Sequence, residues 1–240
     1  MKKLFLVALA ALTLTACKKN NTYTIEGSFD IPLTFQLGDT VVERGPITGY
    51  VYLCSLDGLP FDSVQVVDEK FTFTGPVDPD KPYFAYLVSE YAAGMFAMEP
   101  GTIQAVVSEP VTFTGTPTND AITELMVMGD SVGMLLADEM EALQAKSDSA
   151  LTDSDIIPLY LKYSAMANDL VDSVYKANTD NLVGVYCANV LTIQARSSAE
   201  MKELMEPMSD FVKESELLQQ HLNYLMQIES ETDGEDSAGD

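Results

Sequence analysis

The stretch Phe61-Asp62-Ser63-Val64-Gln65-Val66-Val67-Asp68-Glu69-Lys70-Phe71-Thr72-Phe73-Thr74-Gly75 decides the fold class of this 240-residue chain. Valines, and then phenylalanines, alternate with polar residues on the two sides of Asp68-Glu69. A period of two is typical of β-strands that bury one face. We therefore expect a hairpin whose two apolar faces match. Glutamate tolerates positive φ poorly, which favours a longer loop or a bulge over a two-residue turn.

Other short segments with strand-like composition lie on both sides of this hairpin. They are residues 23–29, 49–54, 83–88, 95–98, 103–107 and 111–113, separated by turn residues such as Asp57-Gly58. Parallel strands need long crossover connections, usually helical, and no helical pattern intervenes. The sequence therefore predicts an antiparallel β-sandwich or meander over residues 23–117.

The hydrophobic period becomes helical after Gly115, and apolar stripes continue to Ile228. Thr118 or Asn119 is expected to cap the first helix, and Ser197 to cap a later one. Residues 229–240 carry six acids and no large apolar side chain, so we expect a disordered tail. The predicted fold class is α+β: an N-terminal antiparallel β-sandwich or meander, followed by a C-terminal α-helical bundle at 118–228.

The N-terminus has the pattern of a bacterial lipoprotein signal. Lys2 and Lys3 precede nine apolar residues, a length that suits a signal peptide and is too short to cross a bilayer. Leu14-Thr15-Ala16-Cys17 then resembles a lipobox, so we expect cleavage between Ala16 and Cys17 and acylation of the cysteine. Residues 1–16 form the expected signal peptide and 17–22 a lipidated tether. The alternative is an ordinary cleaved signal with a chance cysteine.

Acyl chains on Cys17 would hold the chain on a membrane of the cell envelope, outer or inner. In lipoproteins of gut Gram-negative bacteria that this pattern resembles, acidic residues after the lipidated cysteine direct export to the cell surface. Here Lys18-Lys19-Asn20-Asn21 follows, without an acid. The periplasmic face is therefore favoured over the cell surface.

The formal charge of the chain is −24, and loss of Lys2 and Lys3 with the signal peptide makes it −26. A charge of this sign repels nucleic acid, so no nucleic-acid partner is expected. A solvated acidic surface explains the charge more simply than a recognition site for cations or basic partners.

Two cysteines remain after Cys17, in a compartment that favours disulfides. Cys54 and Cys187 either pair or lie buried as small apolar residues, and burial is favoured because no close spacing demands a bridge. The chain has no CxxC motif, and therefore no dithiol redox centre of that kind.

Four motifs carry a resemblance to a known family: Asp62-Ser63, the segment Lys70–Gly75, the turn Met98-Glu99-Pro100-Gly101 and Gly115. In this order they resemble a domain of unknown function of envelope lipoproteins in gut Gram-negative bacteria. In those relatives, this domain and a helical segment precede a thioredoxin-like thiol–disulfide oxidoreductase domain. The present chain stops where that domain would begin, so the resemblance implies a fold, a compartment and a possible thioredoxin-like partner, but no catalytic residue.

Candidate ligand-binding residues are few. His221 is the one histidine and has no triad or metal-ligand pattern around it, and Asp78-Pro79-Asp80 lacks the spacing of a calcium loop. Tyr50, Tyr52, Tyr83 and Tyr86 could stack on a sugar or peptide, although core packing is the simpler explanation. We therefore expect no catalytic residue, no metal site and no cofactor.

The sequence favours a non-enzymatic binding or interaction lipoprotein whose ligand is an unidentified protein, peptide or glycan. The alternative is an accessory protein of a separate thioredoxin-like oxidoreductase. That alternative requires Cys54 or Cys187 to be accessible, because thiol exchange needs an exposed thiolate.

Overall fold

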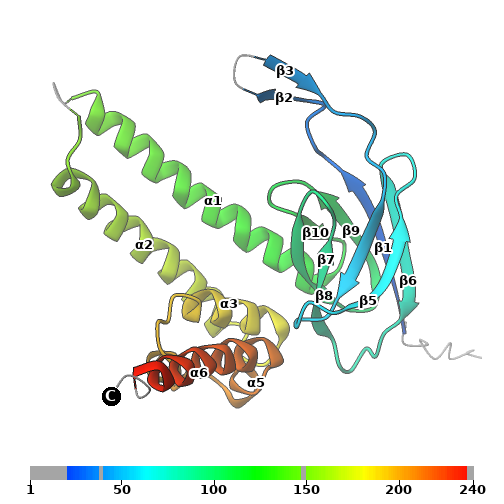
Figure 1. Ribbon diagram of the computed structural model, residues 1–240. Coiled ribbons are helices and arrows are strands. Elements are labelled where there is room, and N and C mark those ends of the chain that lie inside the picture. Colours follow the sequence, from blue (N-terminus) through cyan, green and yellow to red (C-terminus); the bar gives the residue numbers. More distant parts are fainter. Residues whose placement is uncertain (1–20, 38–39, 147–149, 237–240) are drawn as a thin grey trace, which may run out of the picture.

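A computed structural model describes residues 21–37, 40–146 and 150–236. The expected signal peptide, Cys17 and most of the tether lie outside these residues. The described chain forms a β-sandwich followed by helices, which confirms the α+β class (Figure 1). None of the described helices is both long enough and apolar enough to span a bilayer.

The sandwich consists of two four-stranded sheets. The first has the order β10-β9-β1-β6 and contains β1 (Thr22–Phe29), β6 (Lys70–Pro76), β9 (Gly101–Val107) and β10 (Thr112–Thr114). The second has the order β5-β4-β7-β8 and contains β4 (Tyr50–Cys54), β5 (Pro60–Gln65), β7 (Tyr83–Val88) and β8 (Ala93–Met98). A separate ribbon of β2 (Thr34–Leu37) and β3 (Thr40–Glu43) projects from one end of the sandwich (Figure 1).

The inner faces of the two sheets form one apolar core. Its fully buried side chains include Ile25, Leu53, Phe73, Leu87 and Phe96. Burying each such side chain stabilises the fold by roughly 1.5–3 kcal/mol. The alternation in the sequence therefore identifies the inward positions of most strands correctly.

The prediction that residues 61–75 form one continuous hairpin is wrong. Asp68 and Glu69 form a two-residue turn with φ of 51° and 57°, closed by reciprocal backbone hydrogen bonds of 2.9 and 3.0 Å between Val67 and Lys70. Beyond that bridge the strands separate, because β5 pairs with β4 in one sheet and β6 pairs with β1 in the other. The apolar faces therefore meet across the sandwich rather than side by side.

An ion pair holds Glu69 in this unusual backbone conformation. Its carboxylate accepts two hydrogen bonds from Arg44, at 2.7 and 3.2 Å, and a third from the backbone N–H of Ile47 at 3.3 Å. The hydrogen bond from Arg44 lowers the pKa of Glu69 and raises that of Arg44. Arg44 also donates to the carbonyls of Ile31 and Pro32, so the ion pair ties the base of the β2–β3 ribbon to the turn.

One strand pair departs from the antiparallel expectation. β1 runs parallel to β9, with Ile25 opposite Ile103. The connection between the two strands passes through the whole second sheet, so a crossover formed of strands replaces the crossover helix that we assumed to be necessary.

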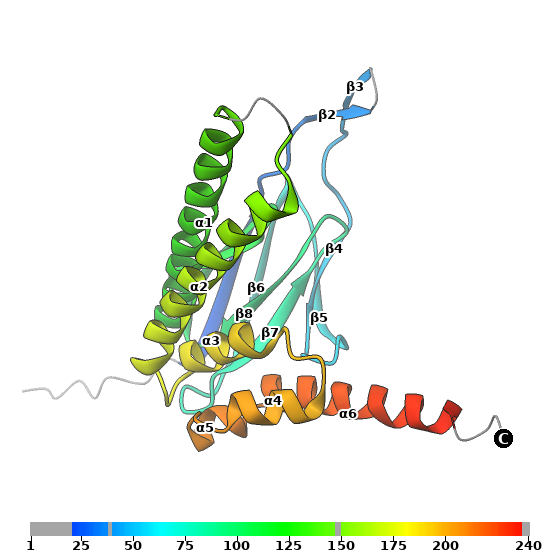
Figure 2. The ribbon, with the colours of Figure 1, turned by 90° about the vertical axis from the view of Figure 1, so that its left-hand side faces the viewer.

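Six helices follow the sandwich in the described part of the chain. They are α1 (Pro117–Gln144), α2 (Asp153–Lys176), α3 (Leu182–Thr192), α4 (Ser198–Met205), α5 (Asp210–Lys213) and α6 (Glu216–Asp236). α1 and α2 form a long antiparallel pair that extends away from the sandwich. α4 and α6 pack against each other at the end of the molecule opposite the β2–β3 ribbon (Figures 1 and 2). A second apolar core joins the helices to Phe84 and Ala97 on the outer face of the second sheet.

Helix α6 continues eight residues into the segment that we expected to be a disordered tail. Glu229, the first residue of that segment, accepts hydrogen bonds of 2.7 Å from both the backbone N–H and the hydroxyl of Ser198. Gln227 donates to Glu231 one turn further along, at 2.9 Å. Anchored in this way, a segment rich in glutamate, which forms helices well, extends the helix instead of ending it.

A single asparagine joins α1 to the edge of the second sheet. Asn119 is 1% exposed; its Oδ1 accepts from the N–H of Ala97 at 2.9 Å, and its Nδ2 donates to the Ala97 carbonyl at 2.9 Å and to Thr116 Oγ1 at 2.8 Å. The amide thus pairs with β8 as a neighbouring strand would. Asn119 is therefore not the helix cap that the sequence suggested, because its acceptor, Oδ1, is occupied by the N–H of Ala97 in the sheet.

The cap of α1 comes instead from the turn before β9. The Glu99 carboxylate accepts from the backbone N–H and the hydroxyl of Thr118, both at 2.9 Å. A negative charge at a helix N-terminus satisfies free N–H groups and complements the helix dipole. Gly101 in the same turn has a φ of +126°, which a residue with a side chain rarely adopts.

Candidate functional site

The outer face of the second sheet carries neighbouring aromatic side chains that are open to solvent. Tyr50 and Tyr52 of β4 are 54% and 40% exposed, and Phe61 of the adjacent strand β5 is 49% exposed. The two tyrosine rings lie 6.4 Å apart between centroids and are tilted by 37°. We call Tyr50, Tyr52 and Phe61 the aromatic face. The position of the two tyrosines follows from alternation, because Val51 and Leu53 turn inward and are fully buried. Phe61 lies at a β-bulge, where the register between β4 and β5 shifts.

The four tyrosines considered from the sequence do not form one group. Tyr86 is the register partner of Cys54, so it shares the outer face with Tyr50 and Tyr52, but it is only partly exposed. Tyr83 lies an odd number of residues from Tyr86 and therefore on the other side of β7. Sequence analysis did not identify Phe61, although the Asp57-Gly58 turn was a local signal that β4 and β5 are neighbours.

Tyr83 belongs to a different set of residues, at the end of the sandwich. Burial raises its pKa, and the pKa of Tyr23 is raised by burial, then by the nearby charge of Asp62 and by Tyr83 itself. Asp62 and Tyr83 therefore lie close to Tyr23, and Tyr83 is not part of the aromatic face.

The register partners of Tyr50 and Tyr52 carry no formal charge. Ser63 and Val88 flank Tyr52 on the two sides, and Gln65 is opposite Tyr50. Uncharged partners are notable on a chain of charge −24. Aromatic rings with polar tips suit ligands that present both apolar faces and hydrogen-bonding groups, and exposed apolar patches often mark interaction sites.

The two cysteines are both free, and Cys187 belongs to the apolar core that joins the helices to the second sheet. Cys54 ends β4 and Cys187 lies in the middle of α3, and both are buried. Burial raises the pKa of the Cys54 thiol, and raises that of Cys187 to about 11. Both therefore have the properties of structural thiols, since a reactive cysteine needs a lowered pKa and access to solvent.

The remaining polar candidates have ordinary local roles. His221 is partly buried on α6. Asp78 accepts a hydrogen bond from the N–H of Asp80 at 3.0 Å, as expected of an aspartate that stabilises a turn. Across the part of the chain that the structure describes, no three His, Cys, Asp or Glu side chains are grouped so that they could hold a metal ion.

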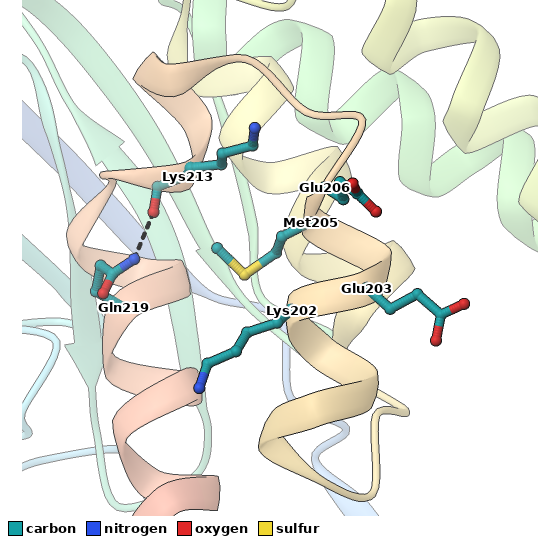
Figure 3. Close-up of a pocket in the computed structure, with 6 residues that line it drawn as sticks. All are labelled: Lys202, Glu203, Met205, Glu206, Lys213 and Gln219. Carbon is teal, nitrogen blue, oxygen red and sulfur yellow. Dashed lines mark hydrogen bonds between the residues drawn. The ribbon is translucent and has the colours of Figure 1, made fainter.

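A pocket of about 530 Å³ lies between α4, α5 and the first turn of α6 (Figure 3). Lys202 and Lys213 enter it from facing elements, with the buried Met205 between them, whereas Glu203 and Glu206 point away. Gln219 donates to the Lys213 carbonyl at 2.6 Å and fixes one wall. The residues that line this pocket come from three helices, so no local sequence signal could have indicated it.

Together, the fold and these surfaces define a two-part α+β protein whose sandwich presents an aromatic face. Residues 23–122 match the family model described as a domain of unknown function, DUF4369. The matched segment spans the sandwich and the first residues of α1, and so includes both Glu99 and Asn119. Comparison with curated proteins and with solved structures gives no match.

Proposed function

We propose that this chain is a lipoprotein of the cell envelope, anchored by an acylated Cys17, and that it acts as a non-enzymatic binding module. The aromatic face is the proposed ligand site, and a peptide or a glycan is the proposed ligand. The periplasmic side of the outer or inner membrane is the proposed location.

The observation that carries this proposal is the exposure of Tyr50, Tyr52 and Phe61 on two adjacent strands of one sheet. Sequence analysis favoured core packing for Tyr50 and Tyr52, yet both side chains face solvent. The sheet beneath them is rigid, because Val51 and Leu53 on its inner side are fully buried. A rigid platform with open rings binds a ligand without a large ordering cost.

Binding is tested with the detergent-purified lipoprotein on arrays of peptides and of neutral and acidic oligosaccharides. A Tyr52→Ala/Phe61→Ala variant should lose at least tenfold in affinity for whatever the parent protein binds. A matched control, Tyr160→Ala/Tyr224→Ala, removes two tyrosines of similar exposure from helices α2 and α6 and should bind normally. Absence of any bound ligand, or equal binding by both variants, would overturn the proposed site.

The anchor is tested separately by mass spectrometry of the protein extracted from membranes. The expected N-terminal peptide begins at Cys17 and carries the mass of two or three acyl chains. A Cys17→Ser variant should accumulate as uncleaved precursor. An unmodified cysteine in the parent protein would refute the anchor and leave the binding site to be judged on its own test.

The alternative, an accessory role in thiol–disulfide exchange, requires an accessible thiol. The burial of Cys54 and Cys187 weighs against it, as do their raised pKa values. Rapid labelling of either cysteine in the folded protein would restore this alternative.

A further inference from the structure

A second pocket lies at the junction of the sandwich and the helices. It has a volume of about 350 Å³ and is lined by residues that include Tyr83 and Phe84 of β7, Leu182 of α3, Phe211 of α5, and Glu214 and Glu216 near the start of α6. Figure 1 shows this end of the sandwich next to α3, α5 and α6. Its volume is within the range of small-ligand pockets, which often occur where domains meet.

The walls of this junction pocket are aromatic and apolar. Phe84 and Leu182 are buried and belong to the core that joins the sheet to the helices. Phe211 and Tyr83 remain exposed. Aromatic ring faces carry a negative quadrupole, which attracts a cation placed over them.

The rim of the junction pocket is negative. Glu214 and Glu216 are both exposed, and neither forms an ion pair with the described residues. Among the described residues, no lysine, arginine or histidine lines the pocket. The neighbouring Lys213 lines the other pocket, on the α4 side (Figure 3). Two full carboxylate charges therefore border a cavity with exposed rings.

Two helix N-termini at the junction pocket contribute positive charge, but less than the negative charge of the two carboxylates. α3 and α6 both begin at the junction pocket, and each N-terminus contributes roughly half a positive charge. The side chain of Asn181 already accepts hydrogen bonds from the N–H groups of Val183 and Gly184 at the start of α3. The two carboxylates therefore outweigh the helix ends, and the rim remains negative.

We propose that the junction pocket binds an arginine side chain presented by a basic peptide segment of a partner protein. The aliphatic stem would lie against Phe84 and Leu182, and the guanidinium between the two glutamates and the ring of Phe211. Arginine fits better than lysine, because its planar guanidinium stacks on rings while donating to carboxylates. This site shares no residue with the aromatic face, so the two binding sites can fail independently.

The test compares two peptides that differ in one charge, acetyl-Leu-Arg-Leu-amide and acetyl-Leu-citrulline-Leu-amide. Their affinities for the full-length lipoprotein in neutral detergent are measured by calorimetry or by NMR titration. The arginine peptide should bind at least tenfold more tightly than its neutral isostere, and this preference should shrink as salt is raised.

Two double variants that change the net charge equally distinguish binding at the junction pocket from general electrostatic attraction to the acidic protein. Glu214→Gln/Glu216→Gln should abolish the preference for arginine, whereas Glu203→Gln/Glu206→Gln, at the C-terminal end of the nearby helix α4, should retain it. Phe211→Ala should weaken both peptides, and far-UV circular dichroism checks that each variant is folded. Equal affinity for the two peptides, equal loss in both double variants, or no binding of the arginine peptide would overturn the proposal.

Discussion

The buried amide of Asn119 should be among the most sensitive polar positions of this protein. Replacing it with alanine removes the acceptor for the Ala97 N–H and the donor to the Ala97 carbonyl at the same time. β8 is an edge strand, so no other strand of the described residues pairs with these two groups on that side. Asn119→Ala should therefore destabilise the attachment of α1 to the sheet.

The size of the effect follows from the two backbone groups left without a partner. Each buried, unsatisfied donor or acceptor costs about 1–3 kcal/mol, which gives a loss of about 2–6 kcal/mol in the free energy of unfolding. Entry of a water molecule into the vacated space would place the loss at the lower end. Asn119→Asp keeps an acceptor for the N–H but sets a carboxylate against the Ala97 carbonyl, so it should not restore stability.

Urea denaturation followed by far-UV circular dichroism measures the loss, and amide hydrogen exchange reports directly on the Ala97 N–H. A matched control is Asn223→Ala, an exposed asparagine on α6, which should change stability by less than about 0.5 kcal/mol. A loss below about 1 kcal/mol for Asn119→Ala, with the Ala97 amide still protected, would refute the reasoning.

Three further predictions follow from buried or strained positions. Cys54 and Cys187 should resist a thiol reagent until the protein unfolds. Stability should fall as pH rises from about 9 to about 11, because folded Cys187 keeps its proton where the unfolded chain has lost it; Cys187→Ala should make that fall shallower in a series of denaturation curves. Asp68→Gly should raise the urea midpoint by relieving a positive φ, whereas Glu69→Gly should lower it, because the lost ion pair outweighs the same relief; a higher midpoint for Glu69→Gly would contradict this. Gly184→Ala should cost about 1–3 kcal/mol despite the better helix propensity of alanine, because the new methyl carbon would lie 1.8 Å from the Asn178 carbonyl oxygen; thermal unfolding unchanged from the parent would exclude the clash.

The candidate sites show how far local patterns can be trusted. Alternation in β4 placed Tyr50 and Tyr52 on the face opposite Val51 and Leu53, and the structure has them so. The same pattern could not tell whether helices would cover that face, because the first helix begins more than sixty residues later. The junction pocket was equally hidden, since its walls come from both parts of the fold.

The sequence alone determined whether each segment is a strand or a helix, because the hydrophobic period of each is visible among neighbouring residues. It therefore indicated a β part, a helical part and the change between them near Gly115. Only the tertiary structure decided that β5 and β6 part into different sheets, that β1 lies parallel to β9, and that Asn119 pairs with β8. These pairings depend on which distant surfaces bury each other best, and that information lies in no single stretch of the chain.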